Sequence, residues 1–128
     1  MKKEDQHKAG IRLKDADEFL ESARNNLEQD RFKASLDHSV DSTIAANDAF
    51  TIHFIGEVAS KDHFEAVKLH KIAGTKISEN KASNLSSLLE ERHRKTYRSV
   101  SVTSNLANEC LKKAERFVDW VRNKISPL

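Results

Sequence analysis

The sequence predicts an all-α protein, an antiparallel up-and-down bundle of four main helices plus a short helix. The 128 residues include only 3 Gly and 1 Pro, too few turn residues for a β-sandwich or barrel. Charged residues make up 33% and hydrophobic residues 38%, a mixture typical of amphipathic helices with one solvated face. Apolar residues also recur at helical spacings along most of the chain.

The length fits one domain, which we expect over residues 13–126, after a charged and frayed segment at residues 1–12. The formal net charge of +2 gives no global argument for nucleic-acid binding, so any basic site must be local. The single cysteine, Cys110, favours a reducing, cytoplasmic location. Because the chain has neither a long apolar run nor a signal peptide, we expect no membrane association.

The first two helices are predicted at about residues 14–28 and 32–55, joined by the tight link Gln29-Asp30-Arg31. The second helix carries one stripe of large apolar residues and one of small residues. The small stripe consists of Ser35, Ser39, Ser42, Ala46, Ala49 and His53. Because small side chains let a neighbouring helix approach, we expect this helix to be central, with Gly56 as its stop signal.

A shorter helix is predicted at about residues 62–72, opened by a capping pair of Asp62 and Glu65 and ended by Gly74. Its apolar residues include Phe64, Val67 and Leu69. The next helix is predicted at about residues 81–98, and Thr103 or Ser104 caps the last one. The last helix has a broad apolar face, made by Leu106, Cys110, Leu111, Ala114, Phe117, Val118, Val121 and Ile125, with Trp120 at its edge.

The densest cluster of chemically active side chains is Arg92-His93-Arg94-Lys95-Thr96-Tyr97-Arg98. Four cations, one imidazole and one phenol could hold phosphates, with Tyr97 stacking on a base. A solvated helix end explains the same run, because cations favour helix C-termini and Glu90 and Glu91 partly cancel them. Both interpretations stay open.

Arg92 shares the inward stripe of Leu85 and Leu89, so its guanidinium needs a carboxylate or a phosphate partner. Asp41 and Asp48 lie seven residues apart on one face of the second helix and are the candidate partners. We favour a role for Asp48 in orienting Arg92. An internal ion pair that holds two helices in register is the structural alternative.

Four of the six histidines lie between residues 38 and 70: His38, His53, His63 and His70. None has the spacing of a zinc motif, so we expect no metal and no cofactor. His63 follows Asp62 and could act as a general base oriented by that carboxylate. The alternative is a helix start with an exposed imidazole.

The order and spacing of these segments resemble the HEPN (higher eukaryotes and prokaryotes nucleotide-binding) family over about residues 13–125. The resemblance is carried by Leu27-Glu28-Gln29-Asp30-Arg31-Phe32-Lys33-Ala34, Asn47-Asp48-Ala49-Phe50, Gly56, Asp62-His63-Phe64-Glu65-Ala66-Val67, Leu88-Leu89-Glu90-Glu91-Arg92 up to Tyr97, and Ala114-Glu115-Arg116-Phe117-Val118-Asp119-Trp120. It implies a bundle of four main helices, commonly a homodimer.

Ribonuclease members of that family carry an arginine followed, after four to six residues, by a histidine near the end of the third long helix. Two such motifs meet across the dimer and cut RNA without metal. Arg92 matches the arginine, but Tyr97, Arg98 and Ser99 occupy the positions allowed for the histidine. Arg31 and His38 have the spacing, but they open the second helix, which is the wrong place.

The resemblance also hints at a different catalytic site, made of Arg92, Tyr97, Asp48 and His63. His93, Arg94, Lys95 and Arg98 would then contact phosphate or RNA. We therefore expect a homodimer that binds RNA or a nucleotide. Its enzymatic form would be a metal-independent endoribonuclease of a toxin or defence system, with a cognate nucleotidyltransferase or antitoxin. A non-catalytic protein–protein interaction domain (dimerisation or scaffold) is the alternative, favoured by the apolar face of the last helix.

Overall fold

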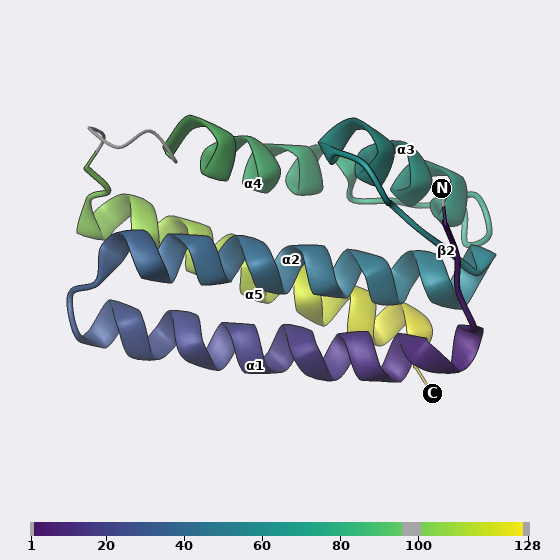
Figure 1. Cartoon of the computed structure of the whole chain (residues 1–128), viewed down its shortest axis with the longest axis horizontal. Helices are drawn as coiled ribbons and strands as arrows, with labels where there is room; N and C mark the ends of the chain where they lie inside the picture. The colour runs from purple at the N-terminus through teal and green to yellow at the C-terminus, as the bar shows by residue number, and fades with distance from the viewer. Residues whose placement is uncertain (1, 96–100, 127–128) are drawn as a thin grey trace.

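The computed structural model describes residues 2–95 and 101–126, and most of them are α-helical. The helices are α1 (Ala9–Glu28), α2 (Phe32–Ile55), α3 (His63–Gly74), α4 (Ala82–Lys95) and α5 (Ser104–Ile125). Figure 1 shows α1, α2 and α5 lying alongside one another, with α3 and α4 following each other along the opposite side of α2. The predicted all-α bundle of four long helices and one short helix is therefore confirmed.

The helix α2 is central, as its two stripes predict, and it contacts each of the other four helices. Its small residues Ser35, Ser39 and Ser42 are fully buried. The Ser35 hydroxyl donates a 2.8 Å hydrogen bond to the carbonyl oxygen of Ala23 on α1. A helix with small side chains can approach its neighbour closely enough for such a side-chain-to-backbone bond. The large residues of the other stripe form the middle of the core, among them Leu36, Val40 and Phe50.

The predicted helix signals are present where the sequence places them. Gly56 ends α2 in the left-handed conformation, at φ 66°. Asp62 caps α3 by accepting a 3.0 Å bond from the Glu65 amide, and Thr103 caps α5 by accepting from Leu106. Gly74 is the last residue of α3 and is needed for a different reason. A Cβ atom at this position would lie 2.6 Å from the carbonyl oxygen of Glu79.

The N-terminal segment differs from the frayed segment expected at residues 1–12. Strand β1 (Lys2–Lys3) pairs antiparallel with strand β2 (Glu57–Val58), and the Glu4 amide donates to the carbonyl oxygen of Gly56 at 2.8 Å. A short 3₁₀ helix, η1 (Gln6–Lys8), leads directly into α1 at Ala9. The extended backbone after Gly56 offers donors and acceptors that the first residues of the chain can pair with.

The broad apolar face of α5 is used inside the bundle. Phe117 and Val118 are at most 2% exposed. The half-buried Trp120 packs on Phe50 and donates from Nε1 to Glu79 Oε1 at 2.9 Å. Phe117 and Val118 are thus covered by the bundle itself, and the alternative of a protein–protein interaction domain stays a prediction. No described helix is long and apolar enough to cross a membrane.

Candidate functional site

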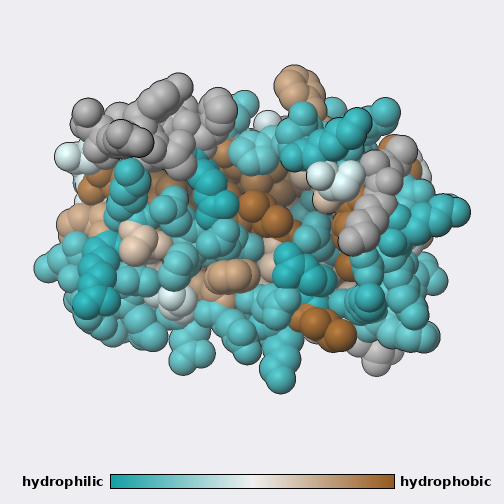
Figure 2. All heavy atoms as spheres, viewed as in Figure 1, coloured by the Kyte–Doolittle hydropathy of each residue, from teal (hydrophilic) through white to brown (hydrophobic). Residues whose placement is uncertain are grey.

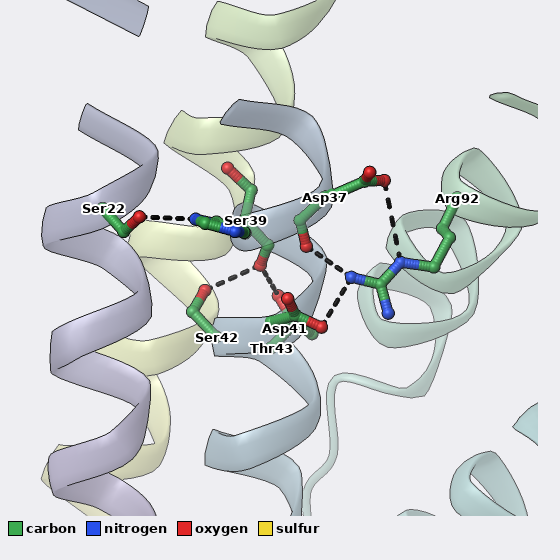
Figure 3. A network of polar contacts seen from close by, with 8 residues as sticks. Ser22, Asp37, Ser39, Asp41, Ser42, Thr43 and Arg92 are labelled. Carbon is green, nitrogen blue, oxygen red and sulfur yellow. Dashed lines mark hydrogen bonds and ion pairs between the residues drawn. The ribbon is translucent and has the colours of Figure 1, made fainter. Parts of the chain in front are cut away.

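Arg92 on α4 is bound to α2, as its inward stripe predicts. Its Nη2 donates to Asp41 Oδ1 at 2.6 Å and to the carbonyl oxygen of Asp37, and its Nε lies 3.9 Å from Asp37 Oδ1 (Figure 3). The side chain remains 24% exposed. Its Nη1 forms no hydrogen bond with the residues that the structure describes.

Of the two candidate partners, Asp41 holds Arg92 and Asp48 does not. Asp48 lies seven residues further along α2, about 10 Å along the helix axis, and pairs with another arginine. Its Oδ2 accepts a 3.0 Å bond from Arg12 Nη2, while Arg12 Nη1 donates to Asp15 at 2.7 Å. The expectation that Asp48 orients Arg92 is therefore wrong. The two arginines occupy separate carboxylate sites on α2.

The Asp48 site is partly desolvated. Burial raises the pKa of the Asp48 carboxyl, and the Arg12 guanidinium lowers it to a smaller extent. Burial also disfavours the charge of Arg12, but its bonds to Asp48 and Asp15 together raise the pKa of its guanidinium. Both pKa values are raised, which disfavours the charged form of Asp48 and favours that of Arg12, because Arg12 has two carboxylate partners and Asp48 has one arginine. The short ion-pair distances favour an ionised cluster, and the cost of burial falls mainly on Asp48.

His63 and Asp48 line the same hollow, between α2, the segment 59–62, α3 and α4. This hollow has a volume of about 240 Å³ and is lined by Ile44, Asn47, Asp48, Ala59, Ser60, Lys61, Asp62, His63, Ala66, Leu85 and Leu89. The segment 59–62 is held in place by Glu65, whose carboxylate accepts from the Ser60 amide at 2.6 Å. That bond lowers the pKa of Glu65. The predicted capping pair thus also shapes the wall of the hollow.

A second, larger hollow of about 630 Å³ continues outward from the first. Its lining is Lys61, Asp62, His63, Phe64, Val67, Ser86, Leu89 and Glu90. Figure 2 shows hydrophobic atoms exposed between the polar groups on this side of the molecule. Phe64 is 89% exposed, although the sequence counts it among the apolar residues of α3. Leu69, five residues on, is buried, and five residues turn a helix by about 140° beyond one full turn, so the two cannot share a face.

His70, which the sequence placed only in a group of histidines, is the centre of a buried polar connection. Its Nδ1 is 2.8 Å from Asn47 Oδ1, and its Nε2 accepts from the Lys81 amide at 2.8 Å. The ring stacks on Phe50 with centroids 4.8 Å apart. Burial lowers the pKa of His70 to about 4, so the neutral imidazole joins α2, α3 and the start of α4. No short-range sequence signal distinguishes this histidine from the others.

The predicted catalytic residues are thus divided between two places. Asp48 and His63 line the inner hollow, whereas Arg92 lies near Asp37 and Asp41. His93, Arg94 and Lys95 belong to the last turn of α4, and Tyr97 and Arg98 lie outside the described residues. Among the described residues, no group of three or more His, Cys, Asp or Glu side chains could hold a metal ion.

The family model described as HEPN domain matches residues 9–124. Since the match covers most of the 128 residues, the chain belongs to the HEPN family, whose domains are associated with nucleotide- or RNA-related functions. No curated protein matches the chain.

Proposed function

We propose that this HEPN protein binds RNA or a nucleotide through the cations at the end of α4, as a homodimer. The single observation that supports this proposal is the state of Arg92. Its Nη2 and Nε face acceptors on α2, and Nη1 makes no bond with the described residues. A guanidinium that is oriented by its own protein loses little side-chain entropy when it binds a phosphate.

The sequence around Arg92 supplies further positive charge for such a ligand. His93, Arg94 and Lys95 follow Arg92 within the last turn of α4, and Tyr97 and Arg98 come next in the sequence. Because the whole chain carries a net charge of only +2, phosphate affinity would be concentrated at this end of α4.

Cleavage of RNA is the enzymatic form of the proposal, without a metal ion. Arg92 would stabilise the charge on the phosphate, and Tyr97 would contact the same nucleotide. Tyrosine has an unperturbed pKa of about 10, which makes it a poor base at neutral pH. Asp48 and His63 line a hollow on a different part of α2 from Arg92, so we assign them to ligand binding and not to proton transfer at that phosphate. A cognate nucleotidyltransferase or antitoxin remains the proposed partner.

The binding test uses fluorescence anisotropy with a 5′-labelled single-stranded RNA over a range of salt concentrations. We expect Arg92→Ala to weaken binding about tenfold and to reduce the slope of log K against log salt by about 1. Arg24→Ala is the matched control, because Arg24 pairs with Glu115 between α1 and α5, away from α4. Equal affinity of both variants and wild type would contradict the assignment of Arg92.

Two further measurements separate the enzymatic and oligomeric parts of the proposal. Incubation of the RNA with wild type and Arg92→Ala in the presence of EDTA tests metal-independent cleavage; RNA left intact by wild type excludes it under those conditions. Light scattering at micromolar concentration tests the homodimer. A protein that dimerises but retains no RNA at low salt would be an interaction domain.

A further inference from the structure

The two hollows on the α3–α4 side form one groove. They share Lys61, Asp62, His63 and Leu89 as lining residues. The inner part is floored by apolar side chains, among them Ile44, Ala66, Leu85 and Leu89. The other lining residues are mostly polar: Asn47, Asp48, Ser60, Lys61, Asp62 and His63. The hollow thus combines apolar contact area with groups that can orient a small ligand.

The outer part of the groove carries an exposed aromatic ring. Phe64 is 89% exposed and lines the larger hollow, next to Val67 on the same helix. A phenyl ring left in water at the edge of a groove offers its face for stacking. Base–aromatic stacking is the main sequence-tolerant contact in proteins that bind single-stranded nucleic acids.

The inner part of the groove offers a hydrogen-bond acceptor. Asp48 pairs with Arg12 through Oδ2, and its Oδ1 has no hydrogen-bond partner among the described residues. The Oδ1 atom keeps contact with solvent, and Asp48 lines the inner hollow. A carboxylate accepts hydrogen bonds from the exocyclic amino groups of cytosine, adenine and guanine. Uracil has no exocyclic amino group, and its N3–H donor lies between two carbonyl oxygens that a carboxylate repels.

The negative charge of the carboxylates around the groove is partly offset by neighbouring groups, which favours the binding of a nucleotide. Arg12 offsets the charge of Asp48, and the first turn of α3 donates to Asp62. Lys61 lies on the rim of both hollows and can meet a phosphate. Leu89 and Glu90 precede Arg92 by less than one turn of α4, so the groove leads toward the proposed phosphate contact.

We propose that this groove binds a nucleobase with an exocyclic amino group, with Asp48 as its acceptor and Phe64 as its stacking surface. The inference rests on the proposed function, because it assumes a nucleic-acid ligand, and it deepens that function by assigning the base. The phosphate of the same ligand lies toward Arg92.

The test compares tetranucleotides of cytidine, adenosine and uridine at low salt by ¹H–¹⁵N NMR titration. We expect the cytidine and adenosine tetramers to bind about tenfold more tightly than the uridine tetramer. Their binding shifts the amide resonances of the segment 59–66 and of Ser86, Leu89 and Glu90, which surround the groove.

Two variants assign the contacts. Phe64→Ala weakens binding of all three tetramers about tenfold, whereas Ile11→Ala leaves it unchanged. Ile11 is the matched control because it is a large hydrophobic residue, 61% exposed, on α1. Asp48→Ala abolishes the preference for amino-bearing bases. Because Phe64 is 89% exposed, we expect Phe64→Ala to fold normally. A loss of binding can then be assigned to the missing ring.

Three outcomes would overturn the base site. Equal affinity for the three tetramers, with shifts confined to the end of α4, would leave phosphate binding intact and remove the groove. Unchanged RNA affinity in Phe64→Ala, together with a change in its sedimentation, would assign Phe64 to a protein contact. No binding of any tetramer or of longer RNA at low salt would overturn the proposed function as well.

Discussion

His70 on α3 is 2.8 Å from Asn47 on α2, measured from Nδ1 to Oδ1, and both side chains are buried. Since Nε2 of the same ring accepts from the Lys81 amide, Nδ1 carries the proton and donates it to Asn47. Asn47 Nδ2 in turn donates to the carbonyl oxygen of Ala66 at 3.4 Å. These bonds fasten α3 to α2 beneath the groove.

The stability of the protein should fall as the pH drops from about 6.5 to about 4. Burial lowers the pKa of His70 to about 4, so the unfolded chain takes up a proton on this residue before the folded chain does. The contribution of neutral His70 to the free energy of unfolding is complete above about pH 6.5 and is lost as the pH falls toward about 4. The loss is on the order of 3 kcal/mol. Urea unfolding at several pH values measures it.

The variant His70→Gln tests whether this residue is the cause. We expect it to be less stable at pH 7 and to lose most of the pH dependence between 4 and 6.5. The control is His7→Gln, whose side chain is 90% exposed, and it should keep the wild-type profile. An unchanged profile in His70→Gln would assign the pH dependence to other groups.

The Arg92–Asp41 pair should contribute to stability, because it is partly shielded from solvent. The side chains are 24% and 31% exposed, and Arg92 also binds the carbonyl oxygen of Asp37. A double-mutant cycle with Arg92→Met and Asp41→Asn should give a coupling energy of about 1–2 kcal/mol.

The more exposed pair Arg24–Glu115 is the matched comparison. Its coupling should be under about 0.5 kcal/mol, because solvent screens exposed pairs. Equal coupling energies for the two cycles would show that α2 does not shield Arg92 in solution.

The variant Gly74→Ala should lower the free energy of unfolding by about 2 kcal/mol. The added Cβ would lie 2.6 Å from the Glu79 carbonyl oxygen and 2.9 Å from Asn80 Cβ, so the turn before α4 must move. Lys71→Ala, an exposed change on the same helix, should stay within about 0.5 kcal/mol of wild type. Thermal or urea unfolding distinguishes the two, and a neutral Gly74→Ala would mean that this turn gives way easily.

The cap of α3 gives a matched pair at a single position. Asp62→Ala removes the acceptor for the Glu65 amide and should cost about 1 kcal/mol, whereas Asp62→Asn keeps an acceptor and should cost a few tenths. Chemical denaturation of both variants provides the measurement. Equal losses would show that charge near the helix start matters more than the bond.

The helices could be predicted from the sequence because their signals are local. The bounds of α2, the glycine at its end and the caps at Asp62 and Thr103 depend on neighbouring residues in the chain. The pairing of β1 with β2 could not be predicted in this way. It joins residues more than fifty positions apart, and neither strand is long enough to show a period.

The candidate site was less predictable because it depends on which side chains meet across helices. The inward position of Arg92 follows from its spacing, but the choice of Asp41 over Asp48 depends on how far α4 lies along α2. The exposure of Phe64 depends on the rotation of α3 about its axis. Hydrophobic periodicity in a helix of 12 residues determines neither quantity well.

The pairing of Lys2 and Lys3 with Val58 and Glu57 has a consequence for synthesis on the ribosome. Strand β1 leaves the ribosome before α1 and α2, yet its hydrogen-bond partners are translated only after the whole of α2. Residues 2–4 therefore stay without these partners until residues 56–58 have been translated. Their amides become protected from exchange with solvent only late, when the chain beyond Gly56 has left the exit tunnel.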